Sequence, residues 1–407
     1  MVSTMHQSRQ GMPASPVSSP LSWRDWIVGG LLLFPVPWMG LVIAAGLFWD
    51  LIWQGIQSLR VVQWLGAWLD QRVQKVGAVM LKDPRNAPYL YSFFGIGLFT
   101  PTLFFSSLYW HLHWGATAAW STLLLWAFAY HVLMMGPYFR FFAYISTLIH
   151  KEGHTPRGLF KKPYSIFNHF FGWFLGPLYG HVPEAYPMGH LRIHHKHDNG
   201  PEDITSTLHL DRTKPSHWLI YLRQFAKFWM GFSIIEYHRR RGNIKQAQRM
   251  LRGMLGYLSV FLILFLLHPW FSFAYYVLPL FCVNIYLCAI NYTWHAFTDP
   301  NDPENEYINS ITILDGHYNV FNEDYHVCHH LYPQKHWTLA PEDFERNKAF
   351  YRQHRASVFR DTQEFEMFMW IITRRFDLLS AHYVDLQGDL SQEEIVALLK
   401  ERMRPVR

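Results

Sequence analysis

The sequence HLRIHHKH at residues 190–197 places four histidines within eight residues, and histidine clusters recur at three other points of the chain. Imidazole nitrogens are common ligands of iron, zinc, copper and nickel ions. Residues three or four apart share a face of a helix, so each cluster can direct several nitrogens into one cavity. The clustered residues are His150 and His154; His190, His194, His195 and His197; Asn291 and His295; and His326, His329 and His330. These ten histidines exceed the three or four ligands of a single zinc ion, which favours two metal ions.

Each cluster follows a long apolar stretch. Half of the residues are hydrophobic, 18% are aromatic and only 16% are charged, which is unusual for a soluble domain. Runs long enough to cross a bilayer lie at 90–110, 115–136 and 270–294, with a shorter run at 254–268. Because these runs pair as two transmembrane helical hairpins, we expect an all-α integral membrane protein with about four spanning helices.

The distribution of Lys and Arg gives the expected orientation. Both predicted hairpin turns, near 111–114 and 268–270, lack Lys and Arg. Basic residues instead crowd 72–85, 151–162, 212–252 and the chain after 335. Since basic segments stay on the cytoplasmic side of a membrane, we expect a cytoplasmic helical cap that holds all the histidine clusters.

We divide the chain into four segments. Residues 1–25, rich in Ser, Pro and Gln, form a predicted disordered tail. Residues 26–85 form a membrane-associated segment, and residues 86–340 form the metal-binding domain. Residues 341–407 form a cytoplasmic C-terminal helical extension.

Two of these segments carry local signals. The apolar run 26–49 contains Pro35 and Pro37 and leads into an amphipathic stretch, so this N-terminal segment could span the membrane, re-enter it or lie on its surface. Its apolar core is too long for a cleaved signal peptide. Near the other end, Ser391 followed three residues later by Glu394 predicts a capping box at a helix N-terminus.

Composition and motifs argue against several functional classes. The net charge is +6, but the basic residues of 239–252 directly precede a hairpin, so lipid headgroups are a better partner than nucleic acid. Three cysteines cannot form a disulfide framework and fit a reducing compartment. The zinc protease motif needs Glu directly after its first His, whereas Lys151 stands there and Glu152 follows. A metal transporter would carry ionisable residues along its spans, whereas these clusters lie outside the apolar runs.

The order of the clusters resembles the membrane fatty acid desaturase and hydroxylase superfamily. Its members carry three histidine boxes, usually H-x(3–4)-H, H-x(2–3)-H-H and H-x2-H-H, after paired transmembrane hairpins. Box order, hairpin length and the sequence HHLYP at 329–333 agree with that pattern over roughly residues 90–335. The pair Asn291 and His295 is similar to the Asn and His that complete the iron shell in acyl-CoA desaturases of this group.

The resemblance implies an O2-dependent oxidoreductase with two non-haem iron ions, and it makes 86–340 a diiron fatty acid desaturase-like domain. O2 would be the cosubstrate and a fatty acyl chain the substrate. We expect desaturation, with acyl or alkyl hydroxylation, or oxidative decarboxylation to terminal alkenes, as alternatives. The complete boxes argue against an inactive scaffold. Carried over by position, the implied ligands are His150, His154, His190, His194, His195, His295, His326, His329 and His330, with Asn291 acting weakly through water.

The second box departs from the usual pattern because His197 follows the histidine pair. On a straight α-helix, His190, His194 and His197 fall within about 60° of one another, while His195 points away by at least about 100°. Either the helix unwinds there or His197 replaces His195. The superfamily pattern favours His195, and His197 is retained as an alternative ligand or a neighbour of the ligands.

Residues around the boxes give three smaller expectations. Phe, Leu and Trp residues of the hairpins could line a narrow tunnel for an alkyl chain. His131, His169 and His181 lack spacing partners and are expected to be hydrogen-bonded core or interfacial residues. Nearby carboxylates could orient ligand rings through their free N–H groups, and we expect about two of six to do so. These six are Glu152, Asp198, Glu202, Asp203, Glu323 and Asp324.

Electrons must come from another protein. The chain lacks a Gly-x-Gly-x-x-Gly nucleotide fingerprint, a Cys-x-x-Cys pair and a set of cysteines for an iron–sulfur cluster. The expected donor is a ferredoxin, or a haem electron carrier with its reductase. The basic residues 239–241 could dock such an acidic protein.

Overall fold

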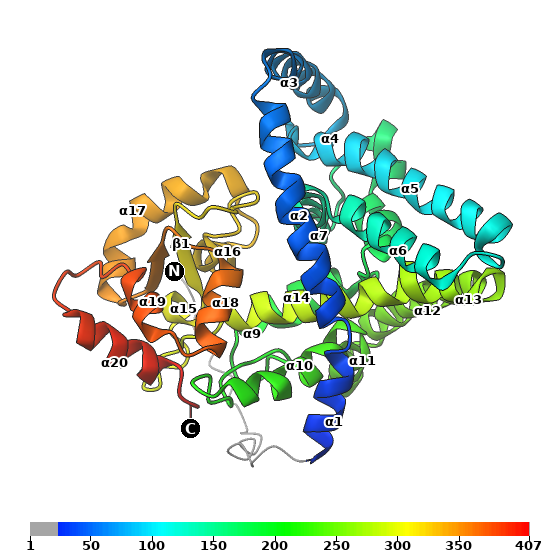
Figure 1. The fold of residues 1–407 in the computed structure, drawn as a ribbon. Helices are drawn as coiled ribbons and strands as arrows, with labels where there is room; N and C mark the ends of the chain where they lie inside the picture. The colour runs from blue at the N-terminus through cyan, green and yellow to red at the C-terminus, as the bar shows by residue number, and fades with distance from the viewer. Residues whose placement is uncertain (1–22, 407) are drawn as a thin grey trace.

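The structure is a computed structural model that describes residues 23–406. Its regular elements are mainly helical, and the one sheet among these residues pairs β1 (Ile311–Leu314) in parallel with β2 (Ser357–Arg360). Figure 1 shows long helical hairpins on one side and a cap, which contains the sheet, on the other. The predicted mainly helical membrane fold is therefore confirmed.

Two helical hairpins form the apolar side of the molecule. The first contains Tyr89–Gly115, which includes α4 (Tyr89–Tyr91) and α5 (Gly97–Trp110), and returns through α6 (Trp120–Met135). The second contains α12 (Ile244–Leu267) and Pro269–Trp294, which includes α13 (Pro269–Ser272) and α14 (Leu278–Trp294). Tyr89–Gly115 and both arms of the second hairpin are long and apolar enough to cross a membrane.

The returning arm of the first hairpin is broken. α6 and the segment Pro137–Gly153, which contains α7 (Arg140–Gly153), are long and apolar enough to cross a membrane only when taken together, and they are bent by 46°. Gly136, Tyr138 and Phe139 have φ angles of 76°, 47° and 60° at the break. Pro137 also lacks the N–H that would continue the helical hydrogen bonds. The break turns α7, with its histidines, toward the cap.

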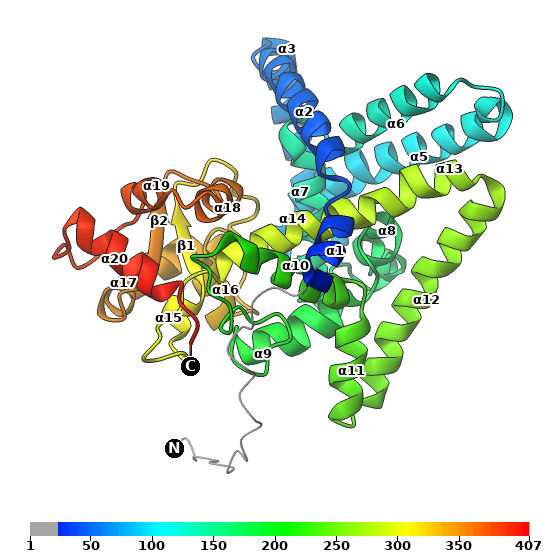
Figure 2. The same cartoon turned by 60° about the horizontal axis from the view of Figure 1, so that its bottom comes forward.

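The N-terminal segment forms α1 (Trp23–Leu32), α2 (Val36–Gln57) and α3 (Arg60–Met80). Trp26–Gln57 is long and apolar enough to be a fourth candidate span. Figures 1 and 2 both show α2 at a steep angle to the hairpin helices, and α2 contacts α6. Its exposed face carries Leu41, Phe48 and Leu51, as expected for a helix that contacts lipid. Residues 1–22 of the predicted tail 1–25 lie outside the described residues.

The cap follows the second hairpin. It consists of the sheet, α15 (Glu306–Asn309), α16 (His326–Leu331), α17 (Ala340–Gln353), α18 (Glu364–Ile372), α19 (Phe376–Ala381) and α20 (Gln392–Arg402). The predicted capping box is confirmed at the start of α20, where the Glu394 backbone N–H donates to Ser391 Oγ and the Ser391 N–H donates to Glu394 Oε2.

A buried arginine joins the end of the chain to the segment after the second histidine box. Arg212 Nη2 donates to the carbonyl oxygens of Arg402 (2.8 Å) and Arg404 (3.0 Å) and to Thr298 Oγ1 (2.7 Å). These contacts satisfy a charge that would be costly to bury alone. The C-terminal residues are thus part of the packing that positions the histidine boxes.

Candidate metal centre

The four histidine clusters meet where the hairpins join the cap. His150 lies in the last turn of α7, His154 follows its last residue, and His295 follows the last residue of α14. The second box occupies a π-helix, Tyr186–His194, and the short α9 (His195–His197), while the third box forms α16. Figure 2 shows α9 and α16 beside the end of α14 that faces the cap. Segments far apart in the sequence therefore supply one site.

The histidines separate into two groups in which all candidate ligand atoms lie within 4.8 Å of one another. Within the first group, His195 Nε2 lies 3.0 Å from His190 Nε2 and 2.9 Å from His329 Nε2. Within the second, the Nε2 atoms of His326 and His330 are 3.2 Å apart. The first histidine group is His150, His154, His190, His195 and His329; the second histidine group is His194, His295, His326 and His330.

Both groups fit metal ions. Two nitrogens bound at right angles to one metal ion, with bonds of about 2.1 Å, would be about 3.0 Å apart. In the second histidine group, Nε2 of His194 and Nε2 of His295 are buried and have no hydrogen-bond partner among the described residues. An unpaired buried nitrogen is costly unless a ligand satisfies it. The donor set, nitrogen throughout, suits iron, zinc, copper or nickel.

The π-helix explains how the second box supplies both groups. A π-helix repeats at i to i+5, so His190 and His195, five residues apart, share a face. His194 then turns to the second histidine group. The second box is therefore not a straight α-helix, and the first of the two predicted solutions, an unwound helix, is the one that the structure shows.

His197 lies outside both histidine groups. Its Nε2 is 2.6 Å from Tyr237 Oη, and its Nδ1 is 3.6 Å from Glu202, which also accepts a 2.9 Å hydrogen bond from Arg241. Tyr237 belongs to α11 (Phe232–Arg240), so His197 links the second box to that helix. Of the two predicted roles of His197, a neighbour of the ligands fits this position better than a metal ligand.

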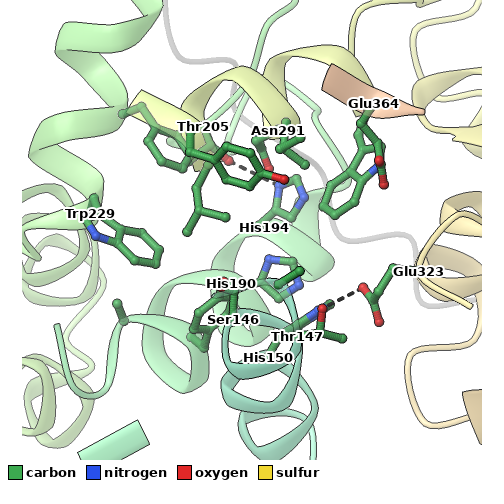
Figure 3. A pocket seen from close by; sticks show the side chains of 18 of the residues that line it. Ser146, Thr147, His150, His190, His194, Thr205, Trp229, Asn291, Glu323 and Glu364 are labelled. Atoms are coloured by element: carbon green, nitrogen blue, oxygen red, sulfur yellow. Dashed lines mark hydrogen bonds and ion pairs between the residues drawn. The ribbon is translucent and has the colours of Figure 1, made fainter. Parts of the chain in front are cut away.

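Asn291 also lies outside both groups, although His295, four residues later, is in the second. The Asn291 side-chain Nδ2 donates a 2.5 Å hydrogen bond to Tyr221 Oη. Asn291 lines the cavity beside the histidines, as Figure 3 shows. Its predicted role through water stays a prediction.

Three of the six predicted carboxylates contact Nδ1 atoms of histidines in the two groups. Glu323 lies 2.9 Å from His150, Asp203 2.6 Å from His194 and Asp198 2.7 Å from His330. Such contacts fix the proton on Nδ1 and leave Nε2 free to bind a metal. The other three lie elsewhere: Glu152 accepts from the Gly172 N–H, Glu202 pairs with Arg241, and Asp324 faces Glu364.

These carboxylates are held in their charged form. Burial raises the pKa of Glu323, but Lys151 and His150 outweigh it and bring the pKa well below its usual range. Burial likewise raises the pKa of Asp203, but His194 and two hydrogen bonds from Thr205 outweigh burial, so the pKa lies well below its usual range. Two negative charges at the rim of a histidine cluster favour cations inside it.

The histidines themselves favour the neutral form. Burial, followed by the repulsion of neighbouring imidazoles, lowers the pKa of His190, His295, His326 and His329 well below the usual value. Neutral imidazole is the form that binds metal ions, so these side chains need not lose a proton first.

A cavity adjoins both groups and is largely apolar (Figure 3). Its empty volume is about 920 Å³, mouth included. His150, His190 and His194 lie on one side, and Phe225, Phe228 and Trp229 of α10 (Pro215–Trp229) lie on another. An alkyl chain could therefore lie beside the metal centre with its carbon atoms shielded from water.

Several residues of the site carry no signal in the sequence. The Asn309 carbonyl oxygen accepts a 2.7 Å hydrogen bond from His295 Nδ1, and Tyr221 holds Asn291. Trp294 stacks on His326 with ring centroids 4.0 Å apart, and only its position next to His295 could have indicated it. Two of the histidines that belong to no cluster are hydrogen-bonded core residues, as predicted. His131 accepts from Trp38 Nε1, and His181 Nε2 lies 3.0 Å from Ser146 Oγ.

Fold and site together indicate a multi-pass membrane protein with two clusters of histidines that could each hold a metal ion. The fatty acid desaturase family model matches residues 126–362. The match covers more than half of the chain and all the histidine clusters, so the protein belongs to this family. Family membership implies oxidoreductase chemistry of the desaturase and hydroxylase kind. The match begins within α6, so α1 to α5 lie outside it. No curated protein and no solved structure matches the chain.

Proposed function

We propose that the protein is a non-haem diiron oxidase that uses O2 and external electrons to introduce a double bond into a fatty acyl chain. The observation that carries this proposal is the apolar cavity that opens directly onto histidines of both groups. A metal site that served only transport or storage would not need an apolar wall beside its ligands.

The nine histidines of the two groups would hold two iron ions, one ion in each group. When bound, the irons supply the reduction of O2 and the oxidation of an unactivated C–H bond. Glu323, Asp203 and Asp198 hold the imidazole rings in position through Nδ1. Phe225, Phe228 and Trp229 exclude water and position the chain.

Alkene and alcohol products differ in the step after the first hydrogen abstraction. Loss of a second hydrogen from the neighbouring carbon gives the alkene, whereas return of oxygen to the same carbon gives the alcohol. We favour the first course because the apolar wall formed by Phe225, Phe228 and Trp229 can hold two adjacent carbons beside the histidines. Hydroxylation and oxidative decarboxylation remain the alternative outcomes of the same site.

The decisive experiment is product analysis by gas chromatography and mass spectrometry. Cells that express the protein are compared with cells that express His329→Ala, and both total acyl chains and headspace volatiles are measured. New unsaturated chains in the first culture alone are the expected result and locate the double bond. Hydroxy-acyl chains would instead show a hydroxylase, and terminal alkenes would show an oxidative decarboxylase.

We place the histidine groups on the cytoplasmic side and the electron donor, a ferredoxin or a haem carrier with its reductase, at α11. Arg240 is exposed on this helix, and Arg241, which follows it, stacks over Tyr237 with 4.0 Å between its guanidinium carbon and the ring centroid. Tyr237 contacts His197, and His238 Nε2 lies 2.9 Å from the Met188 carbonyl oxygen in the π-helix. α11 thus joins a basic surface to the second box, as a docking site for an acidic donor requires.

Stopped-flow reduction tests this docking site. Arg239→Ala combined with Arg240→Ala should slow reduction by the donor protein, and the difference should shrink as salt rises. Reduction by dithionite is the control and should stay unchanged. Equal reduction rates with the donor protein would place its docking surface elsewhere.

A further inference from the structure

A second cavity lies between α2 and the two hairpins. Its empty volume is about 1150 Å³, mouth included. Val42 and Ile43 of α2 form one wall, Met135 and Phe142 the second, and Pro279 and Val283 of α14 the third. Nearly all of its lining is apolar. We call this cavity the membrane chamber and the cavity beside the histidines the catalytic cavity.

Several polar groups at the edges of the membrane chamber already have hydrogen-bond partners, although Nε2 of His131 has none among the described residues. His131 accepts a 2.9 Å hydrogen bond from Trp38 Nε1. The side chain of Gln363 donates to Tyr138 Oη (3.2 Å), and Tyr318 Oη donates to the Tyr138 carbonyl oxygen (2.7 Å). A ligand of this chamber therefore meets hydrocarbon on nearly every side, which suits an alkyl chain and excludes a charged headgroup.

Two tyrosines separate the membrane chamber from the catalytic cavity. Tyr286 and Tyr318 line both cavities. Tyr286 packs edge-on against Phe142, with ring centroids 5.1 Å apart, and Leu287 and Ile290 farther along α14 line the catalytic side only. Because the same two side chains line both cavities, Tyr286 and Tyr318 form the partition between them.

Two parts of the chain that form the membrane chamber are unusual. One lies outside the family match, and the other has a strained backbone. α2 precedes residue 126, where the match begins. The break at Gly136–Phe139, whose Tyr138 and Phe139 adopt left-handed backbone angles, places both side chains against the chamber. Strained backbone that is kept in a fold tends to mark a functional position.

We propose that the membrane chamber binds the distal part of the substrate's alkyl chain, which enters from the lipid beside α2 and reaches the histidines past Tyr286 and Tyr318. This inference rests on the proposed function for the identity of the chain as substrate. Leu47 lines the chamber and is 45% exposed on the apolar face of α2, so the mouth opens toward lipid. The alternative source of such a chain is a structural phospholipid, but a lipid held for structure alone would not need a wall shared with the catalytic cavity.

Photolabelling tests the chamber without requiring turnover. The iron-loaded protein in lipid nanodiscs is irradiated with a long-chain fatty acid that carries a diazirine near its methyl end, and labelled residues are mapped by mass spectrometry. Val42→Trp fills the chamber, and Leu41→Trp is the matched control, since Leu41 is 60% exposed on the same helix. Val283→Phe narrows the opposite wall if Val42→Trp does not fold.

The expected result is labelling within 38–47, 131–142 and 279–286, competed by unlabelled fatty acid. Val42→Trp or Val283→Phe should reduce it about tenfold or more, while Leu41→Trp should leave it unchanged. Labels confined to Phe225–Trp229, or labels that Val42→Trp does not reduce, would overturn the proposal. Labels competed by phospholipid but not by fatty acid would assign the chamber to a structural lipid and also overturn it.

Product analysis on the same variants separates this proposal from the proposed function. If the protein forms no unsaturated product but the chamber is labelled and competed as expected, desaturation fails and the chamber stands. If unsaturated products form and Val42→Trp changes neither their chain length nor their yield, the chamber fails and desaturation stands.

Discussion

The two histidine groups differ in how firmly the protein holds them. All four members of the second group are buried, and His194, His295 and His330 each have an Nδ1 partner, namely Asp203, the Asn309 carbonyl oxygen and Asp198. In the first group, three of five members are only partly buried, and one carboxylate, Glu323, contacts His150.

This difference has a physical consequence. A ring fixed at Nδ1 loses little freedom when its Nε2 binds a metal ion, whereas an unfixed ring must be ordered at that moment. The second histidine group is therefore the better preorganised site. The first is the more adaptable site, and it provides two of the three histidines that line the catalytic cavity.

The largest expected effect comes from adjacent residues of the third box. His329 belongs to the first group and His330 to the second, so His329→Ala and His330→Ala should each remove one metal site and abolish product formation. Product is measured by gas chromatography and mass spectrometry, with membrane insertion as the control for folding. Normal turnover of either variant would remove that residue from the ligand set.

The second box offers a sharper contrast. His195→Ala should abolish product formation, because His195 Nε2 lies within the first group. His197→Ala loses a contact with Tyr237 worth about 1 kcal/mol, so its turnover should stay within about tenfold of the parent protein. Turnover is compared at matched protein levels. The reverse order of effects would mean that His197 is the ligand.

The Nδ1 partners allow a direct comparison of the two groups. Asp203→Asn removes the charge beside His194 and Glu323→Gln removes that beside His150. Each should weaken iron binding in its own group by about 10- to 100-fold and leave the other group unchanged. Iron titration followed by absorbance and elemental analysis measures both. Equal loss from both groups in either variant would show that the sites are not independent.

The smallest expected effect is kinetic. With a chelator in excess, the parent protein should lose iron in two phases, and the first histidine group should empty about tenfold faster because its rings are less buried and less fixed. Rapid sampling with iron analysis follows the two phases, and His329→Ala, which lacks the fast site, should show the slow phase alone. A single phase in the parent protein would contradict the difference between the groups.

Much of the fold could be predicted from local patterns. The hairpins follow from apolar length, and the Ser391 capping box follows from two residues three positions apart. The pairs His150 and His154, and His326 and His330, also follow a local rule, since positions four apart share a helical face. The placement of the N-terminal segment could not be predicted, because length and apolarity allow α2 to span the membrane but do not fix its direction relative to the hairpins.

The rest of the site depends on tertiary structure. The π-helix that unites His190 with His195 packs against α7, α11 and α12 and has no pattern in the sequence. The assignment of His329 to one group and His330 to the other depends on α7, which brings His150 and His154 to the first group, and on α14, which is followed by His295 of the second. Asn309, Tyr221 and the membrane chamber come from segments far apart in the chain, and no spacing rule could have joined them.

The most direct test of the account is the iron content per chain of the parent protein, His329→Ala and His330→Ala, each purified after anaerobic loading. Two separate sites predict about two irons for the parent protein and about one for each variant, with the iron of His330→Ala lost faster to a chelator than the iron of His329→Ala. Two irons in both variants, or one iron in the parent protein, would contradict the assignment of the histidines to two metal sites.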